Sequence, residues 1–308
     1  MRLNTVLLAF LVFLIAVPAV AQPRARTPRT RRTTETSDAS GEAVAAAPTL
    51  EDLGTITPRL ASANADEVRA AIDQLSLIDN PAVIPPLVAM LRAGQPDVIT
   101  ERALEALRGL AEPSSLDVLS EFAHHRRPGA RRRAYLAIAA ITDPRVRALL
   151  EQGLRDSDRQ VRGTCAEQLG HIGARASLEL LFRAFDRGVI EAAASIGRLG
   201  AEATVERFNE HLGHAPLSVM LSGYEQYLVR ADINEAAKID IVTRLGEVSG
   251  RSVREFLGLQ LARLGERDRS RLRTVIQDTI RRIPAEGDTR RTTTAPPPAA
   301  PPTAGGGQ

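Results

Sequence analysis

Large apolar side chains recur at spacings of three and four between about residues 50 and 284, as at Leu178, Leu181 and Phe185. This spacing is typical of amphipathic helices. Proline or glycine separates paired runs, as at Pro81, and such residues end a helix and turn the chain. Alternating runs of β-branched residues are nearly absent, so we predict an all-α structure without a sheet.

The same unit repeats along this region. Residues 169–173 have the sequence LGHIG, residues 196–200 have IGRLG, and residues 245–249 have LGEVS. Nearer the N-terminus the unit has a proline in its turn, at Pro81 and Pro113, which lie 32 residues apart. One short helix pair cannot bury its own apolar stripe, so neighbouring pairs must stack. The repeat therefore predicts a helical solenoid.

The units resemble HEAT repeats, especially the short bacterial form called PBS-lyase HEAT-like repeats, and armadillo-type helical repeats. The resemblance is best at residues 158–162 (DRQVR), which are followed by Ala166 and Leu169, and it recurs at residues 66–69 (DEVR). It implies a right-handed α-α superhelical solenoid. It further implies that Asp66, Arg69, Asp158 and Arg162 have structural roles, as helix caps and as hydrogen bonds to the next turn.

We expect the solenoid to occupy residues 50–284. Its helix pairs are predicted at 64–94, 95–126, 127–157, 158–187, 188–214 and 233–264. Residues 215–232 contain one helix-like run without a clear partner, which fits a degenerate repeat or an insertion. Residues 266–282 are expected to form a C-terminal capping helix.

The N-terminus predicts export. Arg2 precedes an apolar run at residues 6–17, and Ala19 and Ala21 are the small residues that a signal peptidase requires. We expect residues 1–21 to be a signal peptide cleaved after Ala21, giving a periplasmic or secreted protein. The alternative is an uncleaved segment that tethers the chain to the inner membrane, because the arginines just after the run resist export.

The segments beside the solenoid are poor in large apolar residues. Residues 22–49 are rich in Arg, Thr, Ala and Pro, and residues 285–308 are rich in Pro, Thr and Gly, so we expect both to be disordered. Residues 22–34 hold five arginines and no acid, residues 35–49 hold three acids, and Arg2 adds one positive charge, which together give the net charge of +3. The basic segment at 22–34 could contact an anionic membrane surface. The remainder, 50–308, has equal numbers of acidic and basic residues, which argues against a nucleic-acid-binding face.

An arginine cluster follows the second predicted pair, next to two histidines and without an acid. Arginine forks suit phosphate and carboxylate groups, so the cluster is a candidate site for an anion or an acidic partner. The alternative is that salt bridges between repeats, to Glu101, Glu105 or Asp158, engage several of these side chains. The candidate residues are Arg126, Arg127, Arg131, Arg132 and Arg133.

No residue stands out as catalytic, cofactor-binding or metal-ligating. His211 and His214 have the spacing of a zinc ligand pair, but a zinc site needs further ligands, and histidines also favour a helix C-terminus. Cys165, the single cysteine, lies between Val161 and Leu169 on a core-facing stripe, so we expect a small buried side chain. No nucleophilic triad or phosphate-binding glycine loop is present.

The leading hypothesis is a non-catalytic, exported scaffold that binds a protein or peptide on its concave surface. We expect the second helix of each pair to line that surface, with positions such as Ser177 and Ala203 exposed on it. The first alternative is a binder of anionic polymer or membrane surface through the arginine-rich segments. The second is a lyase-like enzyme, which the resemblance to PBS-lyase proteins suggests.

Overall fold

The computed structural model describes residues 47–284. The predicted signal peptide, nearly all of the 22–49 linker and the tail at 285–308 lie outside the described residues. Within 47–284 the chain forms α-helices and short 3-10 helices, with no strand and one isolated bridge between Leu212 and Ala215. The predicted all-α solenoid of helix pairs is confirmed.

The helices follow one another with short turns between them. The α-helices of the described range are α1 (Leu53–Ile56), α2 (Ala65–Ser76), α3 (Ile84–Arg92), α4 (Asp97–Leu110), α5 (Leu116–Phe122), α6 (Pro128–Ala140), α7 (Arg145–Gly153), α8 (Arg159–His171), α9 (Leu178–Asp186), α10 (Ala192–Leu199), α11 (Ala203–Asn209), α12 (Leu217–Val229), α13 (Glu235–Val248), α14 (Arg251–Leu264) and α15 (Arg271–Arg282). The 3-10 helices are η1 (Leu50–Asp52), η2 (Thr57–Ala61), η3 (Pro81–Val83), η4 (Pro113–Ser115) and η5 (Arg175–Ser177).

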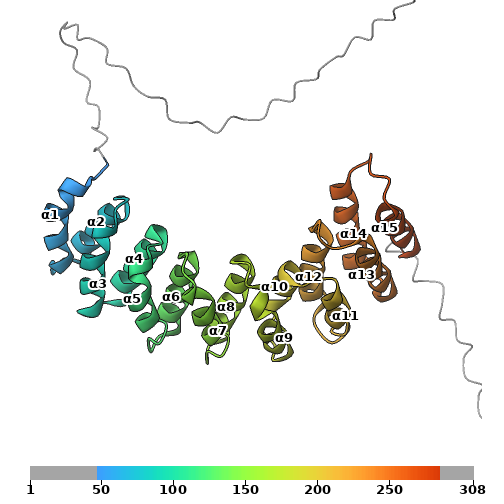
Figure 1. The fold of residues 1–308 in the computed structure, drawn as a ribbon, viewed down its shortest axis with the longest axis horizontal. Coiled ribbons are helices and arrows are strands. Elements are labelled where there is room, and N and C mark those ends of the chain that lie inside the picture. The colour runs from blue at the N-terminus through green and yellow to red at the C-terminus, as the bar shows by residue number, and fades with distance from the viewer. Residues whose placement is uncertain (1–46, 285–308) are drawn as a thin grey trace, which may run out of the picture. The chain divides into compact units, whose positions relative to one another are not determined.

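The helix pairs form two rows. The first helices α2, α4, α6, α8 and α10 each pack on the next and form the inner row. The second helices α3, α5, α7, α9 and α11 form the outer row (Figure 1). Figure 1 shows the first helices on the inner side of the bow that these pairs describe. The expectation that second helices line the concave side is therefore wrong. Neighbouring first helices pack more closely than neighbouring second helices do, so the stack bends towards the first helices.

The rows continue past the segment that lacked a partner in the sequence. α12 packs on α10 and α14 packs on α12, whereas α13 contacts α11 and packs against α15. Residues 215–232 thus supply a first helix whose companion is α13, and α14 is followed by α15. The predicted grouping of the C-terminal helices is therefore wrong by one helix. Because α12 is a first helix, α13 is its second helix and does not pair with α14 as predicted at 233–264, and α15 follows α14 in place of being a separate capping helix.

One continuous core runs between the rows. Equivalent apolar residues of five successive first helices have no exposed surface: Leu75, Leu107, Ile138, Leu169 and Ile196. Leu169 therefore faces the core as predicted. A stripe of such residues, repeated at the same place in every pair, is what allows each pair to bury its apolar face against its neighbours.

The residues that the family resemblance places in structural roles divide into two cases. Asp158 caps α8 as expected, accepting hydrogen bonds from the backbone of Gln160 at 2.9 Å and Val161 at 3.1 Å. In α2, however, the cap is Asn64, which accepts from the backbone N–H of Asp66. Asp66 is in the first turn and forms an ion pair with Arg69 of the same helix.

Candidate functional site

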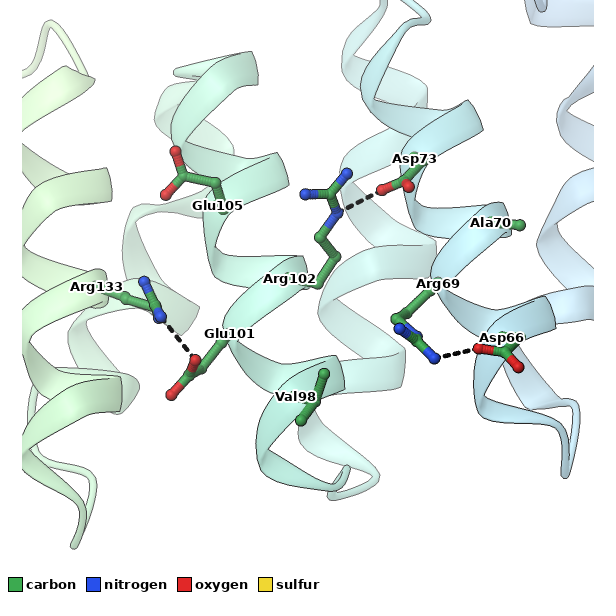
Figure 2. Close-up of a pocket in the computed structure, with 9 residues that line it drawn as sticks. All are labelled: Asp66, Arg69, Ala70, Asp73, Val98, Glu101, Arg102, Glu105 and Arg133. Carbon is green, nitrogen blue, oxygen red and sulfur yellow. Dashed lines mark hydrogen bonds and ion pairs between the residues drawn. The ribbon is translucent and has the colours of Figure 1, made fainter.

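A groove of about 640 Å³ crosses the inner row at α2, α4 and α6. Figure 2 shows its lining side chains, which come from the exposed faces of these three first helices. We call it the charged groove, because seven of its nine lining residues are charged. They are Asp66, Arg69, Ala70, Asp73, Val98, Glu101, Arg102, Glu105 and Arg133.

Ion pairs join the walls of the charged groove. Arg102 of α4 reaches Asp73 of α2, with 2.5 Å between Nε and Oδ1. The hydrogen bond to Asp73 raises the pKa of the Arg102 guanidinium, so this group stays charged. Arg133 of α6 reaches Glu101 of α4 at 2.7 Å (Figure 2). These pairs cross from one repeat to the next and hold the charged side chains in fixed positions along the groove.

Val98 gives the charged groove an apolar contact point. Its side chain is 64% exposed, although it is a large apolar residue at the start of α4. Figure 2 shows it at the start of α4, between Glu101 of the same helix and Arg69 of α2. An exposed apolar side chain surrounded by oriented charges is suited to contact with another polypeptide, since such surfaces combine apolar contact with charge matching.

The sequence did not single out this groove, although a signal was present. Asp73 and Arg102 lie 29 residues apart, and Glu101 and Arg133 lie 32 apart. Opposite charges separated by about one repeat length indicate ion pairs between equivalent helices, provided that both residues lie on the same helix face.

The structure disperses the five arginines of the predicted anion site. Three of them form ion pairs: Arg127 with Asp97 and Arg133 with Glu101 of the preceding repeat, and Arg131 with Asp156 of its own repeat. Arg132 donates to Thr164 Oγ1 at 3.2 Å. Within residues 47–284 neither Arg126 nor Arg132 has an acid at ion-pair distance, and both are exposed. An anion site here stays a prediction that now depends on these two side chains.

The salt-bridge alternative is correct for Glu101 and wrong for the other two acids that it named. Glu105 is 3.1 Å from Arg108 of its own helix, and Asp158 is the cap of α8. Asp97 and Asp156 bind the arginines instead. The helix ends that carry these two acids are brought to the arginines by stacking, which the linear spacing alone does not specify.

The histidines do not form a metal cluster. His211 Nε2 lies 3.6 Å from Asp186, and its ring packs edge-on against Phe185 with centroids 4.9 Å apart. His214 is exposed. In the part of the chain that the structure describes, no three His, Cys, Asp or Glu side chains are grouped so that they could hold a metal ion.

Cys165 and Ser177 are both inaccessible. Cys165 has no exposed surface, and burial raises the pKa of its thiol, in agreement with a structural role. Ser177 is also fully buried and donates to Glu151 at 2.6 Å, so it does not lie on an exposed binding face. Ala203 is exposed, but it belongs to α11 in the outer row.

Comparison with solved structures shows the fold. A homology model of the full-length AP-3 complex in an intermediate open conformation is 15% identical, with a TM-score of 0.53, over 75% of this chain and 50% of that chain. The chain thus spans half the length of that structure. The complex of CpcE and CpcF of phycocyanin lyase from Nostoc sp. PCC7120 is also 15% identical, with a TM-score of 0.42, covering 80% of this chain and 100% of that one.

Human deoxyhypusine hydroxylase in complex with glycerol is 16% identical, with a TM-score of 0.37, over 76% of this chain and 96% of that one. A comparison with curated proteins finds no match. No helix among residues 47–284 is both long and apolar enough to span a membrane. Residues 101–160 match the family model described as HEAT repeats. Together with the stacked helix pairs, this match shows HEAT repeats within residues 101–160 of a helical solenoid.

Proposed function

We propose that this protein is a non-catalytic scaffold that binds a protein or peptide partner in the charged groove of α2, α4 and α6. The observation that carries the proposal is the groove itself. It offers about 640 Å³ of open space on the inner row, with Val98 exposed beside ion pairs that cross between repeats. Solenoids commonly use such a continuous surface of stacked helices to bind extended partners.

The ion pairs favour binding because they set the charged groups before a partner arrives. Arg102 is tied to Asp73 and Arg133 to Glu101, so fewer side-chain rotamers are lost when a partner binds. The alternation of acids and arginines gives a pattern that a partner must match, which favours selectivity.

Two observations support the non-catalytic part of the proposal. A nucleophilic cysteine must be accessible and partly ionised, and burial opposes both for Cys165. Three carboxylates of the charged groove, Asp66, Asp73 and Glu101, form ion pairs with arginines. A carboxylate held in an ion pair is better suited to contact a partner than to transfer a proton.

We place the scaffold outside the cytoplasm. The support is the sequence of the N-terminus: Arg2, the apolar run at 6–17, and the small residues Ala19 and Ala21. Cell fractionation with N-terminal sequencing tests this part. Mature protein that begins at Gln22 in the periplasmic or secreted fraction supports export, and membrane-bound protein that retains residues 6–17 contradicts cleavage.

The groove is tested by capturing partners with tagged full-length protein and comparing Val98→Asp with Leu259→Asp. Both residues are 64% exposed, and Leu259 lies on α14, away from the groove. Val98→Asp should remove the captured partner while leaving the melting temperature unchanged, because the site is exposed and near a helix N-terminus. Leu259→Asp should retain the partner. Equal capture by both variants would contradict the groove proposal.

The arginine-rich alternative predicts a different result. Replacement of Arg126, Arg127, Arg131, Arg132 and Arg133 by Gln would then abolish binding, and binding would weaken steeply as salt is raised. Under the groove proposal, capture persists when only Arg126 and Arg132, the two members without an acid at ion-pair distance within residues 47–284, are replaced. Loss of the partner in that double variant would favour the anionic ligand.

A further inference from the structure

The outer row has one step at which charges are not balanced between neighbouring helices. At the other steps from α3 to α13, an ion pair joins each second helix to the next. These pairs are Arg92–Glu121, Asp117–Arg145, Glu179–Arg207 and Glu206–Arg244. Between α7 and α9, which Figure 1 shows as neighbours, no ion pair joins the described residues.

Three arginines line a small pocket at this step. Arg155 follows the end of α7, while Arg183 and Arg187 lie one turn apart at the end of α9. All three are exposed, and within residues 47–284 none forms an ion pair or a side-chain hydrogen bond. We call this site the arginine pocket.

The one carboxylate on the wall of the arginine pocket is already engaged. Glu151 accepts hydrogen bonds from Arg147 of its own helix and from Ser177, each at 2.6 Å. Its charge is thus matched by Arg147. The remaining wall is apolar, formed by Leu154, Leu180 and Ala184.

A bound anion would relieve a weak repulsion among these arginines. A helix C-terminus attracts a cation, which accounts for one arginine on each helix. The favourable interaction with the helix C-terminus does not remove the repulsion between Arg183 and Arg187. Like charges four residues apart destabilise a helix. An anion placed among the three guanidinium groups would offset that repulsion.

We propose that the arginine pocket binds a small oxyanion with two negative charges, namely a phosphate or sulfate group. Guanidinium groups match such oxygens with paired, charge-assisted hydrogen bonds. The space of about 30 Å³ suits a group of this size. If the group is part of a larger molecule, the rest of that molecule must extend into solvent. Three arginines with no uncompensated acid match a dianion better than a single carboxylate.

This inference is independent of the charged groove, which lies on the inner row. Isothermal titration of the full chain with inorganic phosphate at constant ionic strength tests it. Arg183→Gln/Arg187→Gln should bind about a hundredfold more weakly than the wild type, at about tenfold for each charged hydrogen-bonding group removed. The arginines of residues 22–34 are present in every variant, so any binding by them is common to all.

The matched control is Arg175→Gln/Arg281→Gln, which removes the same charge from two other exposed sites. It should bind phosphate as the wild type does. Sulfate should bind in the same range as phosphate, and acetate about tenfold more weakly. Phenyl phosphate distinguishes two sources of the anion. It should bind more tightly than inorganic phosphate if the ligand is a phosphoryl group attached to a larger molecule, and not if the ligand is free phosphate.

Three outcomes would overturn the proposal. They are equal phosphate binding by the wild type and Arg183→Gln/Arg187→Gln, an equal loss in the control, and acetate binding as tight as that of phosphate. Circular dichroism of each variant establishes that the helical fold is retained, and Val98→Asp should bind phosphate normally because it alters only the groove.

Discussion

Arg131 of α6 and Asp156 at the end of α7 form a nearly buried ion pair. Two hydrogen bonds join them, at 2.8 Å from Nε and 2.6 Å from Nη2, and their side chains are only 11% and 9% exposed. Arg131 also donates to the backbone carbonyl of His125 at 3.0 Å. One guanidinium therefore fixes the turn before α6 and the turn after α7.

Arg131→Gln should destabilise the protein by about 3 kcal/mol, because it leaves Asp156 buried without its partner. The control is Arg281→Gln, whose arginine is 73% exposed beside Asp278 at 50%. That change should alter the free energy of unfolding by about 0.5 kcal/mol or less. Urea unfolding followed by circular dichroism measures both, and equal midpoints for the two variants would contradict the role of Arg131.

The same pair predicts how stability depends on pH. Burial favours a higher pKa for Asp156, but hydrogen bonds from Arg131 and from the Asp158 backbone hold the pKa below its usual value. Because the pKa is lower in the folded state, ionised Asp156 stabilises the fold at pH values above its pKa in the unfolded chain, which is about 3.9. This stabilisation is lost as the pH falls through the pKa of the folded state. The difference in melting temperature between wild type and Asp156→Asn should therefore shrink below about pH 4. A difference that stays constant down to about pH 2 would refute this assignment.

Leu169→Ala should cost about 2–5 kcal/mol, because the side chain is fully buried between first helices and its removal leaves a cavity. Leu259→Ala is the control, since Leu259 is 64% exposed, and it should change stability by about 0.5 kcal/mol or less. Thermal unfolding of both variants measures the contrast. Similar melting temperatures for the two would show that Leu169 is not part of the cooperative core.

Two glycines should respond to alanine in opposite directions. A Cβ added at Gly197 would lie 2.1 Å from the carbonyl oxygen of Gly223, where α10 and α12 approach each other closely. Gly197→Ala should therefore destabilise the protein, by about 1–3 kcal/mol. Gly258 lies inside α14 with nothing within 4 Å of such a Cβ. Gly258→Ala should stabilise the helix by about 0.5–1 kcal/mol. Denaturant midpoints measure both, and destabilisation by each would contradict the contrast.

The sequence by itself determined the class of fold and much of its local detail. The spacing of apolar residues predicts the helices, since that pattern depends on the helical period alone. The core position of Leu169, the cap formed by Asp158 and the burial of Cys165 follow from the same local pattern. Each depends on residues within one or two turns of the side chain concerned.

Only the tertiary structure decided which side chains from different helices meet. Arg131 meets Asp156 and not Asp158, although both acids are present in the same turn. The stacking also puts the first helices on the inner side, places Val98 in a groove and leaves Arg183 facing a pocket without an acid. The physical reason is that such partners are separated by about 25 to 38 residues along the chain. Their approach depends on how far each pair shifts and rotates on the previous one, a quantity set by the packing of the whole interface.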